Sequence, residues 1–245
     1  MTNYSQIFKK RSLLSEGQTN AKTAKNSLKS FILYLAPYNQ NSKGINICPN
    51  ASNGCIKACL FTAGRGKFTS VQLSRMQRTD FYIYERQAFI NKLTNELISL
   101  SKKAQRNNEK YAIRLNGTSD LDFIAIIKNR TQIDVLELPN LVFYDYTKTL
   151  GKVKKYADTS YVLTFSRSED NELEALEALN YGANVAVVFK GGLPSTYLGA
   201  SVIDGDASDI VMLENRSTIL GLKAKGDAKK DSSGFVVNSN SIQYA

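Results

Sequence analysis

The spacing of hydrophobic residues changes near residue 110 of this 245-residue chain. Between residues 69 and 105 the apolar side chains recur every three or four positions, which is the period of an amphipathic helix. A segment of this length exceeds a typical single helix, so we expect a break within it. After residue 110 the apolar residues gather in short β-rich runs instead.

These short runs predict strands, and the amphipathic stretches between them predict helices. The expected strands are residues 31–36, 111–116, 140–145, 161–165, 184–189, 200–203 and 217–222, and the expected helices between them are residues 120–130, 149–157 and 169–181. Alternation of this kind favours an α/β protein with a parallel sheet and helical crossovers. The number of strands suits a complete or partial (β/α) barrel, and an open doubly wound sheet is the alternative.

Polar segments at the two ends of the chain frame one expected domain. Residues 1–30 are rich in Lys, Ser, Thr and Asn and predict a basic flexible arm. Residues 31–228 are expected to form a single α/β domain, followed by a polar tail over residues 229–245. No apolar run reaches the roughly 20 residues that a membrane helix needs, so we expect a cytoplasmic protein.

Polar side chains follow several of the expected strands directly. In parallel sheets the carboxyl ends of the strands carry the functional groups, so these residues are candidates for substrate or cofactor contacts. The catalytic candidates are Arg114, Asn116, Asp120, Tyr144, Asp145 and Lys148, and the further cofactor contacts are Ser166, Arg167 and Lys190. Helix capping and ordinary packing are the structural alternatives for the same residues.

The chain is basic, with 32 Lys and Arg against 22 Asp and Glu, a net charge of +10. Such a surplus favours contact with polyanions, which makes nucleic acid a candidate partner. The chain contains no histidine. The commonest general base and the commonest neutral metal ligand are therefore excluded.

Three cysteines lie close together, with the spacing C-x6-C-x3-C at Cys48, Cys55 and Cys59. If a helix begins at Cys55, Cys59 lies one turn further along, and Gly54 permits a turn that brings Cys48 back to them. In a reducing compartment clustered cysteines favour a metal over a disulfide. An iron–sulfur cluster is favoured over zinc or unmetallated thiols, because zinc normally takes four ligands and no histidine is present. Arg65 is expected to stabilise the negative charge of that cluster.

A larger set of motifs carries a family resemblance. The runs CPNASNGCIKACLFTAGRGKF, RLNGTSDLDF, FYDYTK, LTFSRSEDNE, VVFKGGLPSTYLG, VIDGD and GLKAKG occur in this order between residues 48 and 226. They resemble the family of mycobacteriophage gene product eighty-eight, which is known mostly from phages and prophages. The resemblance covers roughly residues 30–236 and extends, more distantly, to the radical S-adenosylmethionine superfamily.

This resemblance implies a partial β/α barrel with a [4Fe–4S] cluster held by Cys48, Cys55 and Cys59. One iron would be left open for a small molecule or nucleotide, and S-adenosylmethionine is the candidate ligand. The chain departs from the superfamily pattern, which has the spacing C-x3-C-x2-C and a Gly-Gly-Glu segment after an early strand. Here the adjacent glycines Gly191 and Gly192 come late and no acid follows them.

Three functions remain open at this point. The first is a radical-S-adenosylmethionine-like enzyme acting on a nucleotide, nucleic acid or small metabolite, in the host cytoplasm if the gene is phage-encoded. The second is a non-catalytic iron–sulfur protein that binds nucleic acid in phage replication or host takeover. The third is a zinc-stabilised interaction protein. The sequence gives neither the substrate nor the oligomeric state.

Overall fold

The computed structural model describes residues 2–17, 28–59, 64–208 and 211–242. The chain separates into two compact units. The first unit contains residues 1–49 and 67–145, and the second contains residues 50–66 and 146–245. Each unit is built from strands and helices, so the predicted α/β class is confirmed. The sequence alone gives no sign of this division.

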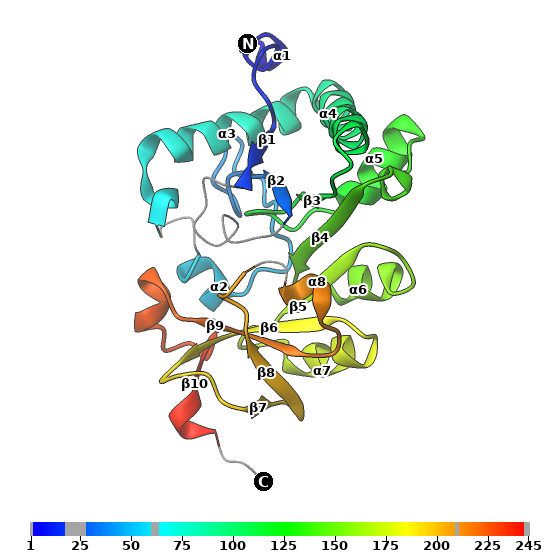
Figure 1. Ribbon diagram of the computed structural model, residues 1–245. Coiled ribbons are helices and arrows are strands. Elements are labelled where there is room, and N and C mark those ends of the chain that lie inside the picture. Colours follow the sequence, from blue (N-terminus) through cyan, green and yellow to red (C-terminus); the bar gives the residue numbers. More distant parts are fainter. Residues whose placement is uncertain (1, 18–27, 60–63, 209–210, 243–245) are drawn as a thin grey trace. The chain divides into compact units, whose positions relative to one another are not determined.

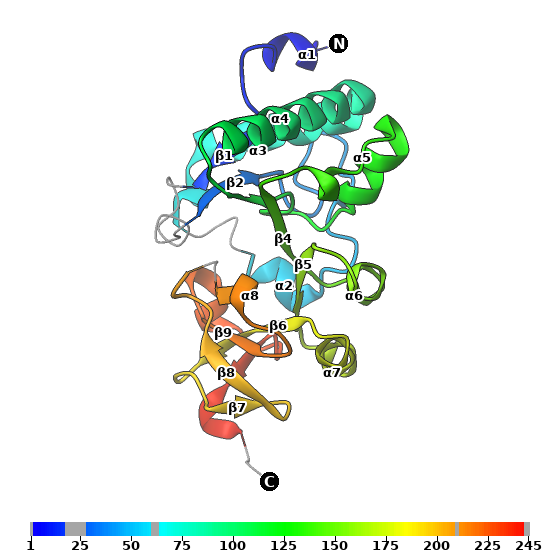
Figure 2. The same ribbon diagram turned by 45° about the vertical axis from the view of Figure 1, so that its right-hand side comes forward.

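The first unit has an open sheet with the strand order β1-β2-β3-β4. β1 runs antiparallel to β2, whereas β2, β3 and β4 are parallel to their neighbours. The strands are β1 (Leu14–Glu16), β2 (Lys29–Leu33), β3 (Tyr111–Arg114) and β4 (Leu141–Thr147), and the helices are α1 (Tyr4–Ile7), α3 (Thr69–Tyr84), α4 (Arg86–Arg106) and α5 (Phe123–Thr131). α3 and α4 cover the same side of these strands in both views (Figures 1 and 2).

Aromatic side chains from three helices form the core of the first unit. Phe89 of α4 packs against Phe81 and Tyr82 of α3 and against Phe123 of α5, with ring centroids 5.4–6.3 Å apart. These rings are at most 5% exposed. Burial of large rings in such pairs is a major source of stability, so α3, α4 and α5 are held together mainly by apolar packing.

The expected break in the long helical segment is confirmed. α3 ends at Tyr84 and α4 begins at Arg86, because Glu85 leaves the helical conformation with φ −128° and ψ 49°. The Glu85 carboxylate accepts hydrogen bonds from the backbone N–H groups of Tyr4 and Ser5. The junction between the helices thus anchors the start of the chain.

The second unit has the strand order β5-β6-β9-β8-β7, and β10 pairs with β6. All pairs are parallel except β7 with β8. The strands are β5 (Val162–Ser166), β6 (Asn184–Lys190), β7 (Thr196–Tyr197), β8 (Ala200–Asp204), β9 (Ile219–Lys223) and β10 (Val236–Asn238). The helices are α2 (Asn53–Lys57), α6 (Leu150–Tyr156), α7 (Glu172–Asn180) and α8 (Val211–Glu214), with short 3-10 turns at Gly64–Lys67, Gly226–Lys230 and Ser239–Ser241.

One edge of β6 is shared by two strands. β5 pairs with the first half of β6, up to Ala186, and β10 pairs with the second half, from Val188. Val188 also pairs with Leu222 of β9, so β10 must occupy the same edge as β5. The chain therefore stops pairing with β6 after Ser166. The residues that follow Ser166 lie beside the C-terminal segment, which contains β10.

All the strands expected from the sequence are present, and the helices over 120–130, 149–157 and 169–181 are confirmed with shifts of a few residues. β1, β7 and β10 were not expected, because each has at most three residues. The strand order within each unit is that of an open sheet, which agrees with the alternative to the predicted barrel. A complete or partial barrel is not confirmed.

Candidate functional site

One glutamate, Glu169, fixes the start of α2, the short helix that contains Cys55. Ser52 caps α2, since its Oγ accepts the backbone N–H of Cys55 (3.1 Å). The same hydroxyl donates to Glu169 Oε2 (2.8 Å), and the backbone N–H of Gly54 donates to Glu169 Oε1 (2.7 Å). Glu169 thus holds the first turn of α2 from a position that is 115 residues away in sequence.

Gly54 is required by the closeness of this packing. A Cβ at this position would lie 2.6 Å from Phe235 Cβ and 2.8 Å from Glu169 Oε2, and it would also collide with the Ser233 hydroxyl. Behind it, Ala58 joins a small apolar cluster with Ala228 and Val236. The C-terminal segment therefore packs directly on α2.

The three cysteines do not belong to one unit. Cys48 lies in the first unit, where its sulfur accepts the backbone N–H of Tyr38 (3.3 Å) and lies 3.9 Å from the carbonyl of Thr118. Cys55 and Cys59 lie in the second unit. All three are half-buried. α2 ends at Lys57, so Cys59 does not follow Cys55 along one continuous helix as the sequence predicted.

The predicted iron–sulfur cluster is wrong. Across the residues that the structure describes, no group of three or more His, Cys, Asp or Glu side chains is placed to hold a metal ion. This finding overturns the [4Fe–4S] assignment and the S-adenosylmethionine expected at its open iron. It gives no support to a zinc site on the same residues either. The prediction required the three sulfurs to converge from one loop and one helical turn, whereas Cys48 belongs to a different unit and α2 ends before Cys59.

The candidate residues after β3 and β4 form a buried network in the first unit. Asp145 is fully buried and accepts hydrogen bonds from the backbone N–H groups of Leu115 (3.1 Å) and Asn116 (2.9 Å) and from Asn116 Nδ2 (3.2 Å). Arg114 Nε lies 3.7 Å from the Asp145 carboxylate, and its side chain is 17% exposed. A buried carboxylate with these donors ties the ends of β3 and β4 together.

Both polar groups of the Asn116 side chain are also engaged in hydrogen bonds. Its Oδ1 accepts from Ser119 Oγ and from the backbone N–H of Leu121, both at 2.9 Å, and its Nδ2 also donates to the Leu121 carbonyl. Tyr144 is 1% exposed, whereas Asp120 is only partly buried, and its backbone N–H donates to the Ile47 carbonyl. Arg114 ends β3 and Asn116 follows it closely, whereas Tyr144 lies in the middle of β4 and Asp120 in the loop before α5. The catalytic role of these residues stays a prediction.

The other candidates lie in the second unit. Lys148 Nζ donates to the carbonyls of Ser166 (3.1 Å) and Arg167 (3.4 Å) and lies 5.3 Å from the centre of the Phe235 ring. Lys190 Nζ donates to a backbone carbonyl of the C-terminal segment. Arg65 is exposed in the 3-10 turn Gly64–Lys67. Lys148, Ser166 and Arg167 are therefore brought together, as the sequence predicted for strand-end residues.

Arg167 joins a charged cluster on the surface of the second unit. Its guanidinium donates to Glu172 (3.0 Å) and to the Gly234 carbonyl (2.5 Å). Glu172 also accepts from the Tyr197 hydroxyl (2.8 Å). Burial, together with this hydrogen bond, raises the pKa of Tyr197 to about 12. Arg167 and Tyr197 are thus joined through Glu172 on this surface.

α4 carries a surface that sequence reasoning missed. The helix is described over its full length, and its nine exposed residues include four cations and no acid. We call this set the outer face of α4; it consists of Arg86, Gln87, Asn91, Asn95, Ser99, Lys102, Lys103, Gln105 and Arg106. The acidic residue of the helix, Glu96, is turned away and accepts the backbone N–H groups of Leu13 and Leu14. Plotting the polar residues at helical period would have revealed this face.

The charge of the chain is concentrated in the first unit. That unit has 19 Lys and Arg against 10 Asp and Glu, a net charge of +9, whereas the second has 13 against 12, a net charge of +1. In the part of the chain that the structure describes, Lys102, Lys103 and Arg106 take part in no ion pair. By contrast, Lys154 and Lys225 of the second unit are paired with carboxylates at 2.6 and 2.7 Å.

A family model described as gene product 88 matches residues 9–239 of the chain. The protein belongs to the gene product 88 family. The expected resemblance to this phage family is confirmed, whereas the likeness to the radical S-adenosylmethionine superfamily is not shown by this match. No curated protein and no solved structure matches the chain.

Membership of the gene product 88 family covers both units. The matched range includes the outer face of α4, the network around Asp145 and the loop with the three cysteines. No helix of the described ranges is long and apolar enough to cross a membrane.

Proposed function

We propose that this gene product 88 family member binds nucleic acid, and that the outer face of α4 in the first unit contacts the phosphate backbone. The observation that carries the proposal is the composition of that face, which has four cations, no acid and five residues with amide or hydroxyl groups. Lys and Arg neutralise phosphates, and Asn, Gln and Ser donate hydrogen bonds to phosphate and sugar oxygens.

The dimensions of α4 suit such a contact. The helix has 21 residues and is therefore about 30 Å long, close to one turn of a nucleic-acid duplex. Lys102, Lys103 and Arg106 fall within roughly 100° of the helix circumference, so they can reach one backbone together. A net charge of +9 on the same unit adds long-range attraction for a polyanion.

A membrane surface is a poorer match for this helix. Helices that bind lipid bury an apolar face between the headgroups. The apolar face of α4 is already occupied, since Phe89, Leu93 and Leu97 are 0% exposed in the core. The exposed surface of α4 that remains for a partner is therefore polar and cationic. Backbone contacts of this kind support binding with little sequence preference.

The test is nucleic-acid binding of the full chain measured by fluorescence anisotropy. The probes are labelled single-stranded and duplex DNA and RNA of about 30 nucleotides, at about 50 mM and about 200 mM salt. The triple variant Lys102→Gln, Lys103→Gln, Arg106→Gln should bind about ten-fold or more weakly at the lower salt. The slope of log K against log salt should fall by roughly 2 to 3.

A matched variant in the second unit provides the control. Lys57→Gln, Lys229→Gln, Lys230→Gln removes the same charge from three exposed lysines outside α4. This control should keep most of the affinity and the wild-type salt slope. Equal losses in the two triple variants would show that net charge alone acts, and absence of binding at the lower salt would refute the proposal.

A further inference from the structure

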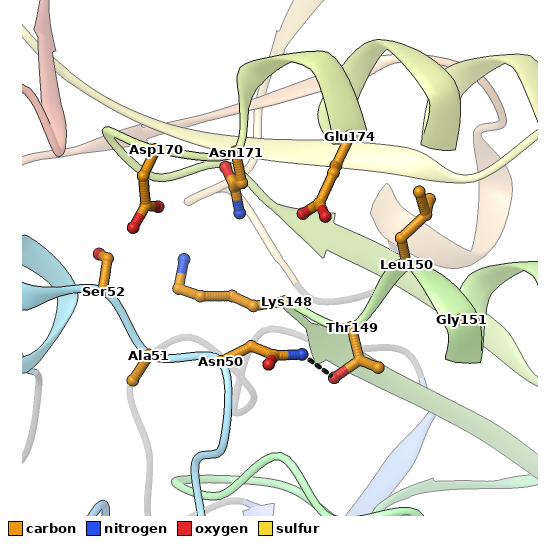
Figure 3. A pocket seen from close by; sticks show the side chains of 10 residues that line it. All are labelled: Asn50, Ala51, Ser52, Lys148, Thr149, Leu150, Gly151, Asp170, Asn171 and Glu174. Carbon is orange, nitrogen blue, oxygen red and sulfur yellow. Dashed lines mark hydrogen bonds between the residues drawn. The ribbon is translucent and has the colours of Figure 1, made fainter.

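The second unit contains a cavity of about 460 Å³, which lies in the size range of small-molecule sites. Three loops line it: the segment before α2, the turn between β4 and α6, and the turn between β5 and α7 (Figure 3). The last two turns follow the carboxyl ends of parallel strands, where α/β proteins commonly bind ligands. All the lining residues belong to the second unit, so the cavity is separate from the outer face of α4.

Part of the cavity wall is fixed by hydrogen bonds. Asn171 is 8% exposed; its Oδ1 accepts the backbone N–H of Ser168 and its Nδ2 donates to the Ser166 carbonyl. Ser52 is 6% exposed and is held by Glu169, as described above. Asn50 Nδ2 donates to Thr149 Oγ1 (2.8 Å), which joins two of the three loops. A wall fixed in this way is preorganised for a ligand.

The remaining groups offer mainly acceptors to the cavity. The Glu174 carboxylate points into the cavity in Figure 3 and, among the described residues, receives no hydrogen bond or ion pair. Asp170 accepts one hydrogen bond, from Ser168 Oγ, and is otherwise exposed. Asn50 keeps its carbonyl oxygen, since only its Nδ2 is engaged. Lys148 also lines the cavity (Figure 3), and its Nζ is engaged with the carbonyls of Ser166 and Arg167.

This mixture of groups restricts the chemistry of a ligand. Two carboxylates disfavour an anion such as a phosphate, and the Lys148 ammonium disfavours a polyamine. A hydroxyl group carries no charge and can donate to a carboxylate, so it suits a cavity that contains both charge signs. Neighbouring hydroxyls on one ring can each donate to one of the two carboxylates. Few apolar groups line the cavity, Ala51 and Leu150 among them, which favours a polar ring over a hydrophobic one.

We propose that this cavity binds a sugar ring through its neighbouring hydroxyl groups, with Asp170 and Glu174 as acceptors. Two sources share this chemistry, a free sugar and the ribose of a nucleoside. The site does not depend on nucleic-acid binding by α4, because different residues of different units form the two surfaces.

The test is ligand-observed NMR and calorimetry of the full chain with D-ribose, adenosine and 2′-deoxyadenosine. Adenosine should bind, and removal of its 2′-hydroxyl should weaken binding about ten-fold, because a neighbouring pair of hydroxyls is lost. Comparable affinity for D-ribose would assign the site to free sugars, and much weaker D-ribose binding would assign it to nucleosides. Binding of neither ribose nor adenosine would overturn the proposal.

Isosteric variants locate the binding on the cavity. Glu174→Gln and Asp170→Asn should each weaken sugar binding about ten-fold or more, since a charged acceptor is replaced by a neutral one. Glu214→Gln removes an exposed carboxylate elsewhere in the same unit and should leave the affinity unchanged. Unchanged binding in both cavity variants would place the ligand elsewhere and refute the assignment. Nucleic-acid affinity should be the same in all three variants.

Discussion

The first unit of this protein carries 19 Lys and Arg against 10 Asp and Glu, and the second carries 13 against 12. Ion pairs occur in both units: Lys128 Nζ of the first lies 2.7 Å from Asp134, and Lys154 Nζ of the second lies 2.6 Å from Glu177. In the described part of the chain, Lys102, Lys103 and Arg106 of α4 take part in no ion pair. Exposed ion pairs add little stability, so the difference bears mainly on what each unit can bind.

The two units also differ in what holds them together. In the first unit, large rings from three helices fill the core and one buried carboxylate, Asp145, ties two strands together. In the second unit, Glu169 and a tightly packed glycine, Gly54, hold a short helix against the C-terminal segment. We therefore expect the stability of the first unit to depend strongly on one polar residue, Asp145. We expect that of the second unit to depend on one tightly packed position, Gly54.

The largest expected effect is loss of the Asp145 carboxylate. Asp145→Ala should lower the free energy of unfolding by about 3–5 kcal/mol, because it leaves two buried backbone N–H groups without their acceptor and removes the carboxylate that lies 3.7 Å from Arg114. Urea denaturation followed by circular dichroism measures this loss. Asp145→Asn keeps one acceptor oxygen and should cost less. A loss below about 1 kcal/mol for the alanine variant would show that the network contributes little.

The local pattern of the sequence predicted a large part of the fold. The period of apolar residues predicted the helical region of α3 and α4, its length predicted a break at an unspecified position, and the β-rich runs predicted seven strands. The same pattern placed Asn116, Asp145 and Lys148 at strand ends, where the structure has them. These features depend on residues that are close in sequence, which is why periodicity reports them.

Features that depend on distant residues could not be predicted. The cysteine spacing suggested one metal site because it assumed a helix through Cys59, yet α2 stops at Lys57. Its first turn is held by Glu169 and packs against the C-terminal segment, more than 100 residues away. The cavity beside it is likewise assembled from three separate loops. Tertiary contacts of this kind override local spacing and leave no periodic trace in the sequence.

A smaller effect is expected at the packing position of the second unit. Gly54→Ala should destabilise the protein by about 1–3 kcal/mol, because the new Cβ would lie 2.6 Å from Phe235 Cβ and neighbouring atoms would have to move. Gly151→Ala is the matched control in α6, where nothing lies within 4 Å of the added Cβ. It should leave stability unchanged or raise it by up to about 1 kcal/mol.

Thermal unfolding of these two glycine variants side by side separates packing from backbone effects. If Gly54→Ala and Gly151→Ala change the melting temperature equally, α2 does not pack tightly against the C-terminal segment. Tight packing would then not distinguish the second unit from the first. A loss in Gly54→Ala alone would support it. Combining Gly54→Ala with Ser233→Ala should recover part of the loss, since one of the colliding atoms is then absent.

The smallest effect concerns an exposed pair of the first unit, where Glu109 accepts from Lys29 Nζ (2.7 Å). This hydrogen bond, with those from Tyr111 and Asn107, lowers the pKa of Glu109 from 4.5 to about 2. A lowered folded-state pKa means that the stabilisation is complete above pH 4.5 and is lost as pH falls through about 2. Stability measured against pH should therefore fall less steeply in Glu109→Gln than in the wild type over this window. Lys29→Gln should reduce the slope as well, and the double variant should add little, because both changes remove the same interaction. Fully additive changes would mean that the pair does not act as a unit.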